Sequence, residues 1–470
     1  MSSRSGGLLE LVARGKKDVF FTANPTISFF HSVYKRAAPF TKEIHLIKPR
    51  NTPEWGKWVD FDFDHRGDIV KNTYIRIELP SWLPETAKQA NASGIVTYDL
   101  SGTTYGYCNN IGFQMLEKIQ FFQDQVLLHE TYGEFLDWRL RQLYDQAKIF
   151  IVGSQIGSRD ESALAIGRSA SLQELRVPIS ILGWQSLADP GLPMIALRRQ
   201  RFRIRIFLRK LEEIVVASDG RIPANPWNKQ LYIQSTKNGK IDTTQKSLVK
   251  SAMKTIGMTL ETTQLYIPAD AQIFLKAQTI RFPFQNIQSQ QYTIDDNVFT
   301  AASLNPLGVV KFPMVIDCIG SINRFLVGFR SEAATMAGQR LDLRSPVTQD
   351  RFINTMRLNI SNIDRVKQWS TAFYKEVTSY WKNDRMALEL YNLNLPQEVY
   401  TITFGGSEKR VPSGTINFTR AVNAILYLTL NAIEYDPRII SRKTFALLYA
   451  ESWNVIEITD GKGKLMFDDS

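Results

Sequence analysis

Three aspartates alternate with aromatic residues in the segment WVDFDFDHRGD, which spans residues 58–68. In a β-strand, Asp60, Asp62 and Asp64 would project from one face, with Phe61 and Phe63 on the other. Carboxylates grouped in this way could bind a divalent cation or act as the acid and nucleophile of a glycosidase. A solvated strand face gives the same alternation, and we favour that interpretation.

A second segment alternates arginine with apolar residues from Arg201 to Ile206, which predicts a strand with one basic face. No acidic residue interrupts the cations of this region, which are Arg198, Arg199, Arg201, Arg203, Arg205, Arg209 and Lys210. We favour a solvated edge strand that its charges protect from aggregation. A polar seam against a neighbouring subunit is the second interpretation, with Arg198 to Arg205 as inter-subunit candidates. Nucleic-acid binding is the weakest, because no aromatic platforms are interleaved with the arginines.

The N-terminus combines apolar and basic residues. Residues 1–50 contain nine Lys or Arg against three acidic residues, within a chain of net charge +11. The pattern predicts an arm that is ordered against partner proteins or membrane lipid, rather than a disordered arm. The candidate assembly residues of this arm are Leu8, Leu9, Leu11, Arg14, Lys16 and Lys17. The apolar run at residues 8–13 is too short for a secretory signal.

The remaining chemistry-bearing residues form no catalytic constellation. The four histidines, His31, His45, His65 and His129, have no metal-ligand spacing, and no phosphate-binding loop or nucleophile elbow occurs. Cys108 and Cys318 are the only cysteines, which excludes a disulfide framework and fits a reducing compartment. We therefore expect no enzymatic activity, cofactor or metal site.

Three asparagines stand in N-x-[ST] sequons, Asn91, Asn359 and Asn417. They are the possible glycosylation sites of the chain. Because no secretory signal accompanies them, we do not expect ordinary secretory glycosylation.

Most informative segments alternate with a period of two residues, which indicates β-strands. The predicted strands lie at 74–79, 119–122 and 126–128 (a hairpin), 201–206, 279–284, 309–316, 323–329, 424–430 and 453–458. The best helix signal begins at Thr131, where Glu134 three residues later suggests a capping box.

A polar stretch at residues 217–250 divides the chain into two halves of roughly 200 residues, each long enough for an eight-stranded sandwich. We predict an all-β protein of two tandem eight-stranded jelly rolls, with a few short helices in loops. The predicted parts are an arm at 1–24, a first roll at 25–215, a linker at 216–256 and a second roll at 257–470. Residues 85–110 and 153–171 are predicted long loops.

Two motifs near opposite ends of the chain are specific. The first is DVFFTANP at residues 18–25, followed by FFHSVYKR at 29–36, and the second is PSGTINFTR at 412–420. Between them, residues 119–136, 177–179, 190–197 and 358–374 agree in the same order. With these segments the sequence resembles the major capsid proteins of nucleocytoplasmic large DNA viruses. It departs from the family pattern at Ala421-Val422, at 217–250 and in the basic turn at residues 461–464.

The resemblance implies two jelly rolls that stand side by side, normal to a shell, with three chains in a pseudo-hexagonal capsomer of an icosahedral virus. It implies as partners neighbouring capsomers, minor capsid and penton proteins and an internal viral membrane, with no specific nucleic acid. It also implies assembly into virions in the cytoplasm of the infected host cell. The alternatives are a minor capsid or scaffold protein of the same fold, a carbohydrate-binding sandwich or glycosidase that uses Asp60, Asp62 and Asp64, and a basic nucleic-acid-binding protein.

Overall fold

We analysed a computed structural model of the chain. It describes residues 39–63, 66–80, 88–90, 96–98, 105–143, 146–159, 162, 165–166, 169, 173–179, 191–217, 236–237, 240–241, 256–340, 343, 353–371, 373–374, 399–404, 414–421, 423–431 and 442–467. The predicted arm at 1–24, with all its candidate assembly residues, lies outside the described residues, as do Asp64, His31, His65 and Asn91.

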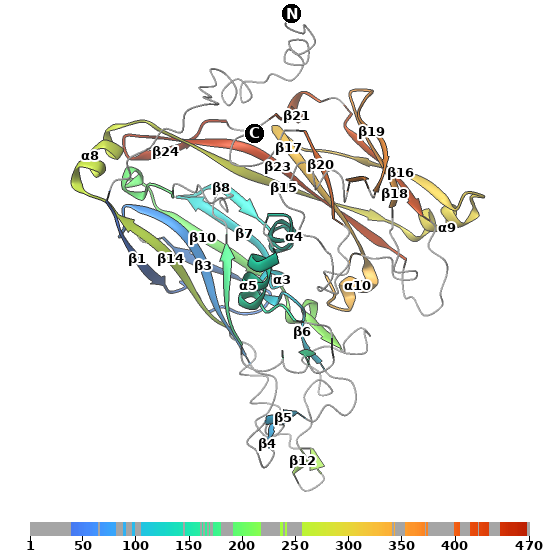
Figure 1. Ribbon diagram of the computed structural model, residues 1–470, viewed down its shortest axis with the longest axis horizontal. Helices are drawn as coiled ribbons and strands as arrows, with labels where there is room; N and C mark the ends of the chain where they lie inside the picture. The colour runs from blue at the N-terminus through green and yellow to red at the C-terminus, as the bar shows by residue number, and fades with distance from the viewer. Residues whose placement is uncertain are drawn as a thin grey trace, which may run out of the picture.

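The first jelly roll consists of two four-stranded antiparallel sheets (Figure 1). One sheet has the order β1-β14-β3-β9, formed by Thr41–Ile47, Gly257–Tyr266, Ile69–Leu79 and Gln173–Ile179. The other has the order β2-β10-β7-β8, formed by Trp58–Asp62, Phe202–Leu208, Leu116–Gln123 and Val126–Thr131. Alternate side chains of both sheets meet in one core.

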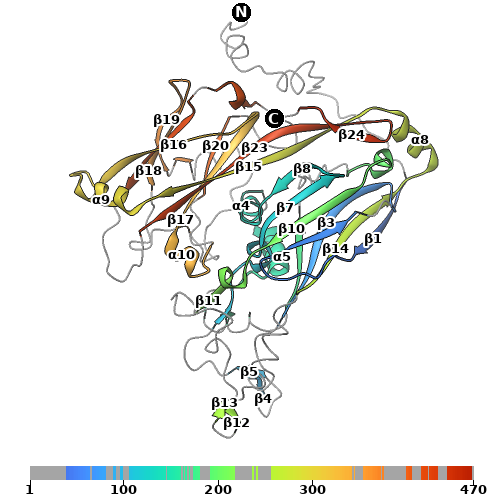
Figure 2. The ribbon, with the colours of Figure 1, turned by 180° about the vertical axis from the view of Figure 1, so that it is seen from behind.

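The second jelly roll repeats this arrangement (Figure 2). One sheet has the order β15-β23-β17-β20, formed by Ile280–Ile294, Thr444–Thr459, Ser321–Ser331 and Val399–Thr403, and is extended by β21 (Ile416–Asn417) and β24 (Lys462–Leu465). The other has the order β16-β22-β18-β19, formed by Val309–Val315, Ile425–Asn431, Ile353–Ile360 and Ile363–Ser370. The predicted fold class, two eight-stranded rolls in tandem, is thereby confirmed.

β14 begins at the residue where we predicted the second roll, yet it belongs to a sheet of the first. It pairs with β1 on one side and with β3 on the other, where Leu260 lies opposite Ile75. Periodicity identifies a strand but does not say which sheet receives it, so the sequence could not supply this crossover. We therefore propose that the first roll extends to Tyr266 and that the second begins after α8 (Ala269–Ala277).

The predicted strands are all present among the described residues, several of them longer than expected. The predicted hairpin is β7 and β8, which turn tightly at Asp124 with a positive φ of 53°. β10 alternates as predicted, with Phe202, Ile204 and Ile206 in the core. Pro178, Pro283 and Pro313 lie in the sheet-edge strands β9, β15 and β16, where the missing N–H disrupts no inner ladder.

The helices are short and lie in the connections. They are α3 (Ile111–Gln114), α4 (Gly133–Leu143), α5 (Gln146–Ile156), α9 (Asp296–Leu304), α10 (Glu332–Met336), η2 (Met194–Leu197), η3 (Leu211–Glu213) and η6 (Phe418–Arg420). Among the described residues, no helix has the length and apolar character that a membrane span requires.

Short strand pairs occur in the predicted loops. They are β4 (Lys88–Ala90) with β5 (Val96–Tyr98), β12 (Thr236–Lys237) with β13 (Lys240–Ile241), and β6 (Tyr105–Tyr107) with β11 (Val215–Ala217). β4, β5 and β12 gather at the end of the molecule opposite α8 and β24 (Figures 1 and 2). Segments from the first predicted loop and from the central linker therefore lie together.

Candidate functional site at the joint between the two jelly rolls

The two rolls share a buried joint, because β17 and β23 have side chains buried on both faces. On β23, Leu448 and Ala450 enter the core of the second roll, whereas Leu447 and Tyr449 join the core of the first. Strands buried on both faces are rich in apolar residues without alternation, and β23 begins with TFALLYA. This signal was visible in the sequence, but the predicted strand at 453–458 did not include it.

Helix α4 of the first roll, together with Tyr132 just before it, packs against the face of β23 that carries Leu447 and Tyr449 and covers it with aromatic rings. Tyr132, Phe135 and Trp138 surround Tyr449, with ring centroids 5.6, 5.5 and 5.1 Å away. Burial in this apolar setting raises the pKa of the Tyr449 phenol. The ring cluster fixes the distance between the rolls, since tilted aromatic pairs prefer such separations.

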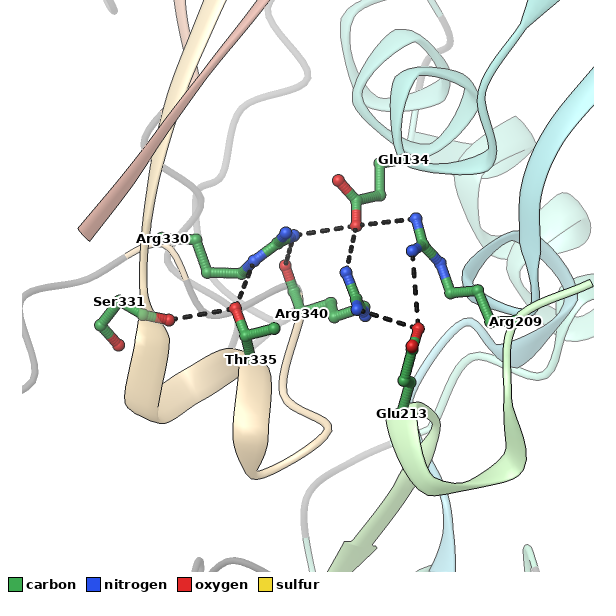
Figure 3. A network of polar contacts seen from close by, with 7 residues as sticks. All are labelled: Glu134, Arg209, Glu213, Arg330, Ser331, Thr335 and Arg340. Atoms are coloured by element: carbon green, nitrogen blue, oxygen red, sulfur yellow. Dashed lines mark hydrogen bonds and ion pairs between the residues drawn. The ribbon is translucent and has the colours of Figure 1, made fainter. Parts of the chain in front are cut away.

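Beside the rings, α4 presents a buried carboxylate to three arginines (Figure 3). The Glu134 carboxylate accepts hydrogen bonds from Arg330 at 2.9 Å, from Arg209 at 3.1 Å and from Arg340 at 3.2 Å. Arg209 belongs to the first roll, whereas Arg330 on β17 and Arg340 after α10 belong to the second. Glu213 accepts a further hydrogen bond from Arg340 at 3.1 Å. The cluster therefore links both rolls through one carboxylate.

Two opposing effects set the pKa of Glu134. Burial on its own would raise the pKa, but Arg330, Arg209 and Arg340 together outweigh it and lower the pKa from 4.5 to about 2. In the unfolded chain, the pKa of the Glu134 carboxyl lies near its ordinary value of 4.5. The cluster therefore contributes its full stability above about pH 4.5 and loses it as the pH falls towards 2.

A second charge cluster reverses these roles, because α4 supplies a guanidinium group and the second roll supplies the carboxylate. Arg139 of the helix lies 3.0 Å from Glu451 on β23, and Arg324 on β17 lies 2.6 Å from the other oxygen of that carboxylate. All three side chains are buried. Helix α4 therefore places one carboxylate and one guanidinium group in the joint. Each of them is paired with oppositely charged side chains of the second roll. Because unpaired charges are costly to bury, these pairings specify a single orientation of the rolls.

Close backbone approach completes the joint. A Cβ atom at Gly328 on β17 would lie 2.5 Å from the indole of Trp138. Only glycine leaves room for the ring at this point. The rolls are thus held by matched shape as well as by charge.

His129 on β8 also faces the second roll, with Phe284 of β15 6.3 Å away between ring centroids. Burial lowers the pKa of its imidazole from 6.5 to about 3, although a hydrogen bond with the backbone of Gln285 opposes the shift. The imidazole is therefore neutral in the folded protein at physiological pH. Its contribution to stability is complete above about pH 6.5 and declines as the pH falls towards 3.

The predicted capping box at the start of α4 is wrong. The helix begins at Gly133, the Thr131 hydroxyl has no hydrogen-bond partner, and the Glu134 carboxylate binds arginines instead of capping the helix. Charged groups of the second roll outcompete the local backbone for this carboxylate. Sequence spacing alone could not reveal partners nearly 200 positions away.

The arginine ladder lies inside a sheet, so the predicted edge strand is also wrong. β10 pairs with β2 on one side and with β7 on the other. Arg205 forms two hydrogen bonds to the buried Asp60 of β2, at 2.8 and 2.9 Å, and its guanidinium lies 4.3 Å from the centre of the Trp58 ring. Arg203 approaches the same carboxylate at 3.8 Å. Two of the five inter-subunit candidates thus have partners within the chain.

The two described aspartates of β2 differ in their exposure to solvent. Asp60 and Phe61 point to opposite faces as predicted, but Asp60 is buried beneath arginines rather than solvated. Asp62 is exposed and lies 3.4 Å from Arg50. Within the described part of the chain, no group of three potential metal ligands occurs. A carboxylate already bound by two arginines is a poor glycosidase acid, and the structure does not favour that alternative.

The other predicted site residues are dispersed. Arg198, Arg199 and Arg201 are exposed at the start of β10. Asn359 is half-buried and donates a hydrogen bond to Asp364 at 2.8 Å, and Asn417 is half-buried in β21.

Comparison with known proteins gives the same picture as the fold. A family described as the major capsid protein N-terminus matches residues 28–258. This match covers 231 of the 470 residues, just under half of the chain, and over it the chain is similar to the major capsid proteins of large DNA viruses. It is 21% identical to the major capsid protein of Pyramimonas orientalis virus, in an alignment that covers 98% of this chain and 99% of the relative.

Two capsid proteins of Acanthamoeba polyphaga mimivirus match only in part. The probable capsid protein 4 is 26% identical over 225 residues, which are 44% of this chain and 39% of the relative. For capsid protein 1 the match covers 46% of this chain and 36% of the relative. The chain therefore spans less than half the length of these longer relatives.

Solved structures agree in fold. A chain of the PBCV-1 virus capsid matches with a TM-score of 0.67 and 13% identity, over 94% of this chain and 100% of that one. The Faustovirus major capsid protein matches with a TM-score of 0.59 and 12% identity, over 95% and 94%. At this level of identity the match shows that the chain has the fold of these capsid proteins. The relatives point to a non-enzyme, in line with our expectation.

We predict that Glu134→Gln weakens the joint. The substitution leaves three guanidinium groups without their shared carboxylate, so the free energy of unfolding should fall by roughly 3–5 kcal/mol at pH 7. The difference between wild type and variant should shrink as the pH falls from about 4.5 towards 2. Urea unfolding over this pH range measures both effects, and the protonation of His129 cancels because it is common to both proteins.

Glu117→Gln is the matched control, because Glu117 is exposed on β7. It should change the unfolding free energy by less than about 0.5 kcal/mol at any of these pH values. An equal effect of the two substitutions would contradict the assignment of Glu134 as the central charge of the joint.

We also predict that Gly328→Ala destabilises the protein by about 1–3 kcal/mol, because the new methyl group meets the Trp138 indole. Trp138→Phe removes the atoms that the methyl group would contact. In the Trp138→Phe background the alanine should therefore cost less than half as much. Additive losses in this double-mutant cycle, measured by urea unfolding, would show that the two residues do not interact.

Proposed function

We propose that the chain is one subunit of a homotrimeric, pseudo-hexagonal capsomer that tiles an icosahedral virus shell. The observation that carries this proposal is the pair of eight-stranded rolls held in one orientation by a buried joint. Three such chains supply six similar rolls, the number that a pseudo-hexagonal block requires. A joint specified by buried charge keeps each pair of rolls rigid, as a repeated tile demands.

The two ends of the molecule differ in a way that fits a shell subunit. β4, β5 and β12 come from the predicted long loop at 85–110 and from the central linker, and they gather at one end (Figure 1). We assign this end to the outer tower of the capsomer. The opposite end, with α8 and β24, then faces the interior of the shell.

Exposed apolar side chains on the second roll support lateral contacts between copies. Leu304 ends α9, Leu307 follows it, and their side chains are 81% and 80% exposed. Side chains of this kind are typical of surfaces that a partner covers. We assign them to contacts within the trimer or with neighbouring capsomers. Minor capsid and penton proteins are further proposed partners, and assembly takes place in the cytoplasm of the infected host cell.

The trimer has a direct test. Size-exclusion chromatography with light scattering should give about 161 kDa, three times the 53.7 kDa of the chain. A stable monomer at high protein concentration would contradict the proposed capsomer. The Leu304→Ser/Leu307→Ser variant should lose trimers or their association if these residues lie in a contact.

The N-terminal arm gives a second test. We propose that residues 1–24 face inwards and contact minor capsid proteins or an internal membrane. Deletion of these residues should leave trimers intact in light scattering, because the arm precedes the first described strand, while shell assembly fails. Normal particles from the truncated protein, seen by electron microscopy of infected cells, would refute this role.

A further inference from the structure

Two basic segments that lie about 260 positions apart in the sequence meet at one end of the first roll. The turn from β23 into β24 lies against residues 198–201, which lead from η2 into β10. Arg199 donates its backbone N–H to the carbonyl of Gly461 at 3.1 Å, and Gln200 exchanges two hydrogen bonds with Gly463, at 2.6 and 3.3 Å. The basic C-terminal turn and the start of the arginine ladder therefore form one surface.

The cations of this surface face solvent. Exposed side chains carry five positive charges, on Arg198, Arg199, Arg201, Lys462 and Lys464. None of the five forms an ion pair within the described part of the chain. Asp124 and Asp460 are the exposed acidic residues beside them. The surface therefore has an excess of positive charge that no acidic side chain pairs with, unlike β10 further along, where Arg203 and Arg205 pair with Asp60.

Exposed apolar side chains border the cations on one side. Helix α8 lies against η2, and its Ile273 and Phe274 are 64% and 58% exposed. Phe40 is 59% exposed and precedes Thr41, which pairs with Tyr266 just before the helix. An aromatic and aliphatic rim thus stands next to the basic turn.

The hairpin turn of β7 and β8 borders the cations on the other side. Asp124 donates its backbone N–H to the carbonyl of Arg201 at 2.7 Å, and its carboxylate accepts the backbone N–H of Arg201 at 3.0 Å. Val126 and Leu127, which begin β8 directly after the turn, are exposed. We call this surface the basic end. It consists of the five cations and the exposed apolar side chains on α8 and beside the turn, so it combines two kinds of exposed group.

We propose that the basic end binds the surface of a membrane that contains anionic phospholipids. Lysine and arginine are attracted to anionic headgroups, and neighbouring aliphatic and aromatic side chains enter the boundary between headgroups and acyl chains. A nucleic-acid surface would instead interleave cations with aromatic platforms for the bases, whereas the exposed apolar groups here are mostly aliphatic.

The position of the basic end supports this partner. It lies opposite β4, β5 and β12 (Figures 1 and 2). The expected strength of membrane binding rests on the proposed capsomer, because three copies would present three basic ends to one membrane and bind with avidity.

The test is co-sedimentation of the full-length protein with phosphatidylcholine vesicles, with and without phosphatidylserine. The protein should bind only the vesicles that contain phosphatidylserine, and less as the salt concentration rises. Lys462→Glu/Lys464→Glu should weaken binding at least about tenfold. Ile273→Ser/Phe274→Ser should also weaken it, through loss of the apolar contact.

Matched controls lie on the second roll. Lys311→Glu/Lys367→Glu makes the same charge change on β16 and β19, and Val315→Ser/Ile363→Ser removes apolar groups of the same two strands that are 58% and 55% exposed. Neither should alter vesicle binding by more than about twofold. Equal losses in the variants and their controls would overturn the proposal, as would binding carried by the arm alone, seen as an unchanged affinity of Lys462→Glu/Lys464→Glu.

Two further outcomes separate this inference from the capsomer. A protein that is trimeric by light scattering but ignores phosphatidylserine vesicles would overturn the membrane contact and leave the proposed function standing. Binding to duplex DNA without binding to vesicles would replace the lipid by nucleic acid. A monomer that binds vesicles through Lys462 and Lys464 would support the surface and contradict the trimer.

Discussion

The burial of charge on α4 is the constraint on which the relation between the two rolls depends. The side chains of Glu134 and Arg139 project from the first roll into a region that is otherwise filled by aromatic rings. Apolar surfaces alone can slide over one another at small cost, whereas a buried carboxylate that loses its arginines is strongly destabilised. The joint therefore has one arrangement, and a single chain behaves as a rigid two-roll unit.

This rigidity connects the fold with the proposed role of a shell subunit. A tile that repeats many times must have the same shape in every copy, and the charged joint supplies that uniformity. The same charges make the joint sensitive to acid, because Glu134 and His129 both lose their contribution as the pH falls. Stability near neutral pH and weakening in acid follow from the same few residues.

Arginine has two different roles in this chain, and the difference depends on place. Along β10, Arg203 and Arg205 both pair with Asp60 and stabilise the sheet from its outer face. Before β10, the guanidinium groups of Arg198, Arg199 and Arg201 form no ion pair with a described residue, and they lie beside Lys462 and Lys464 instead. One continuous sequence pattern is thus divided between an internal structural function and an outward-facing surface.

The sequence by itself determined the all-β character, nine of the strands, the apolar face of β10 and the resemblance to the capsid protein family, because these depend on local periodicity and on ordered motifs. It also excluded an obvious catalytic site. Only the tertiary structure decided that β14 joins the first roll, that β10 lies inside a sheet, that Glu134 binds arginines rather than capping α4, and that residues 198–201 meet residues 461–464. Each of these depends on contacts between positions far apart in the chain, and the free energy of such contacts is set by packing and burial that local spacing does not encode.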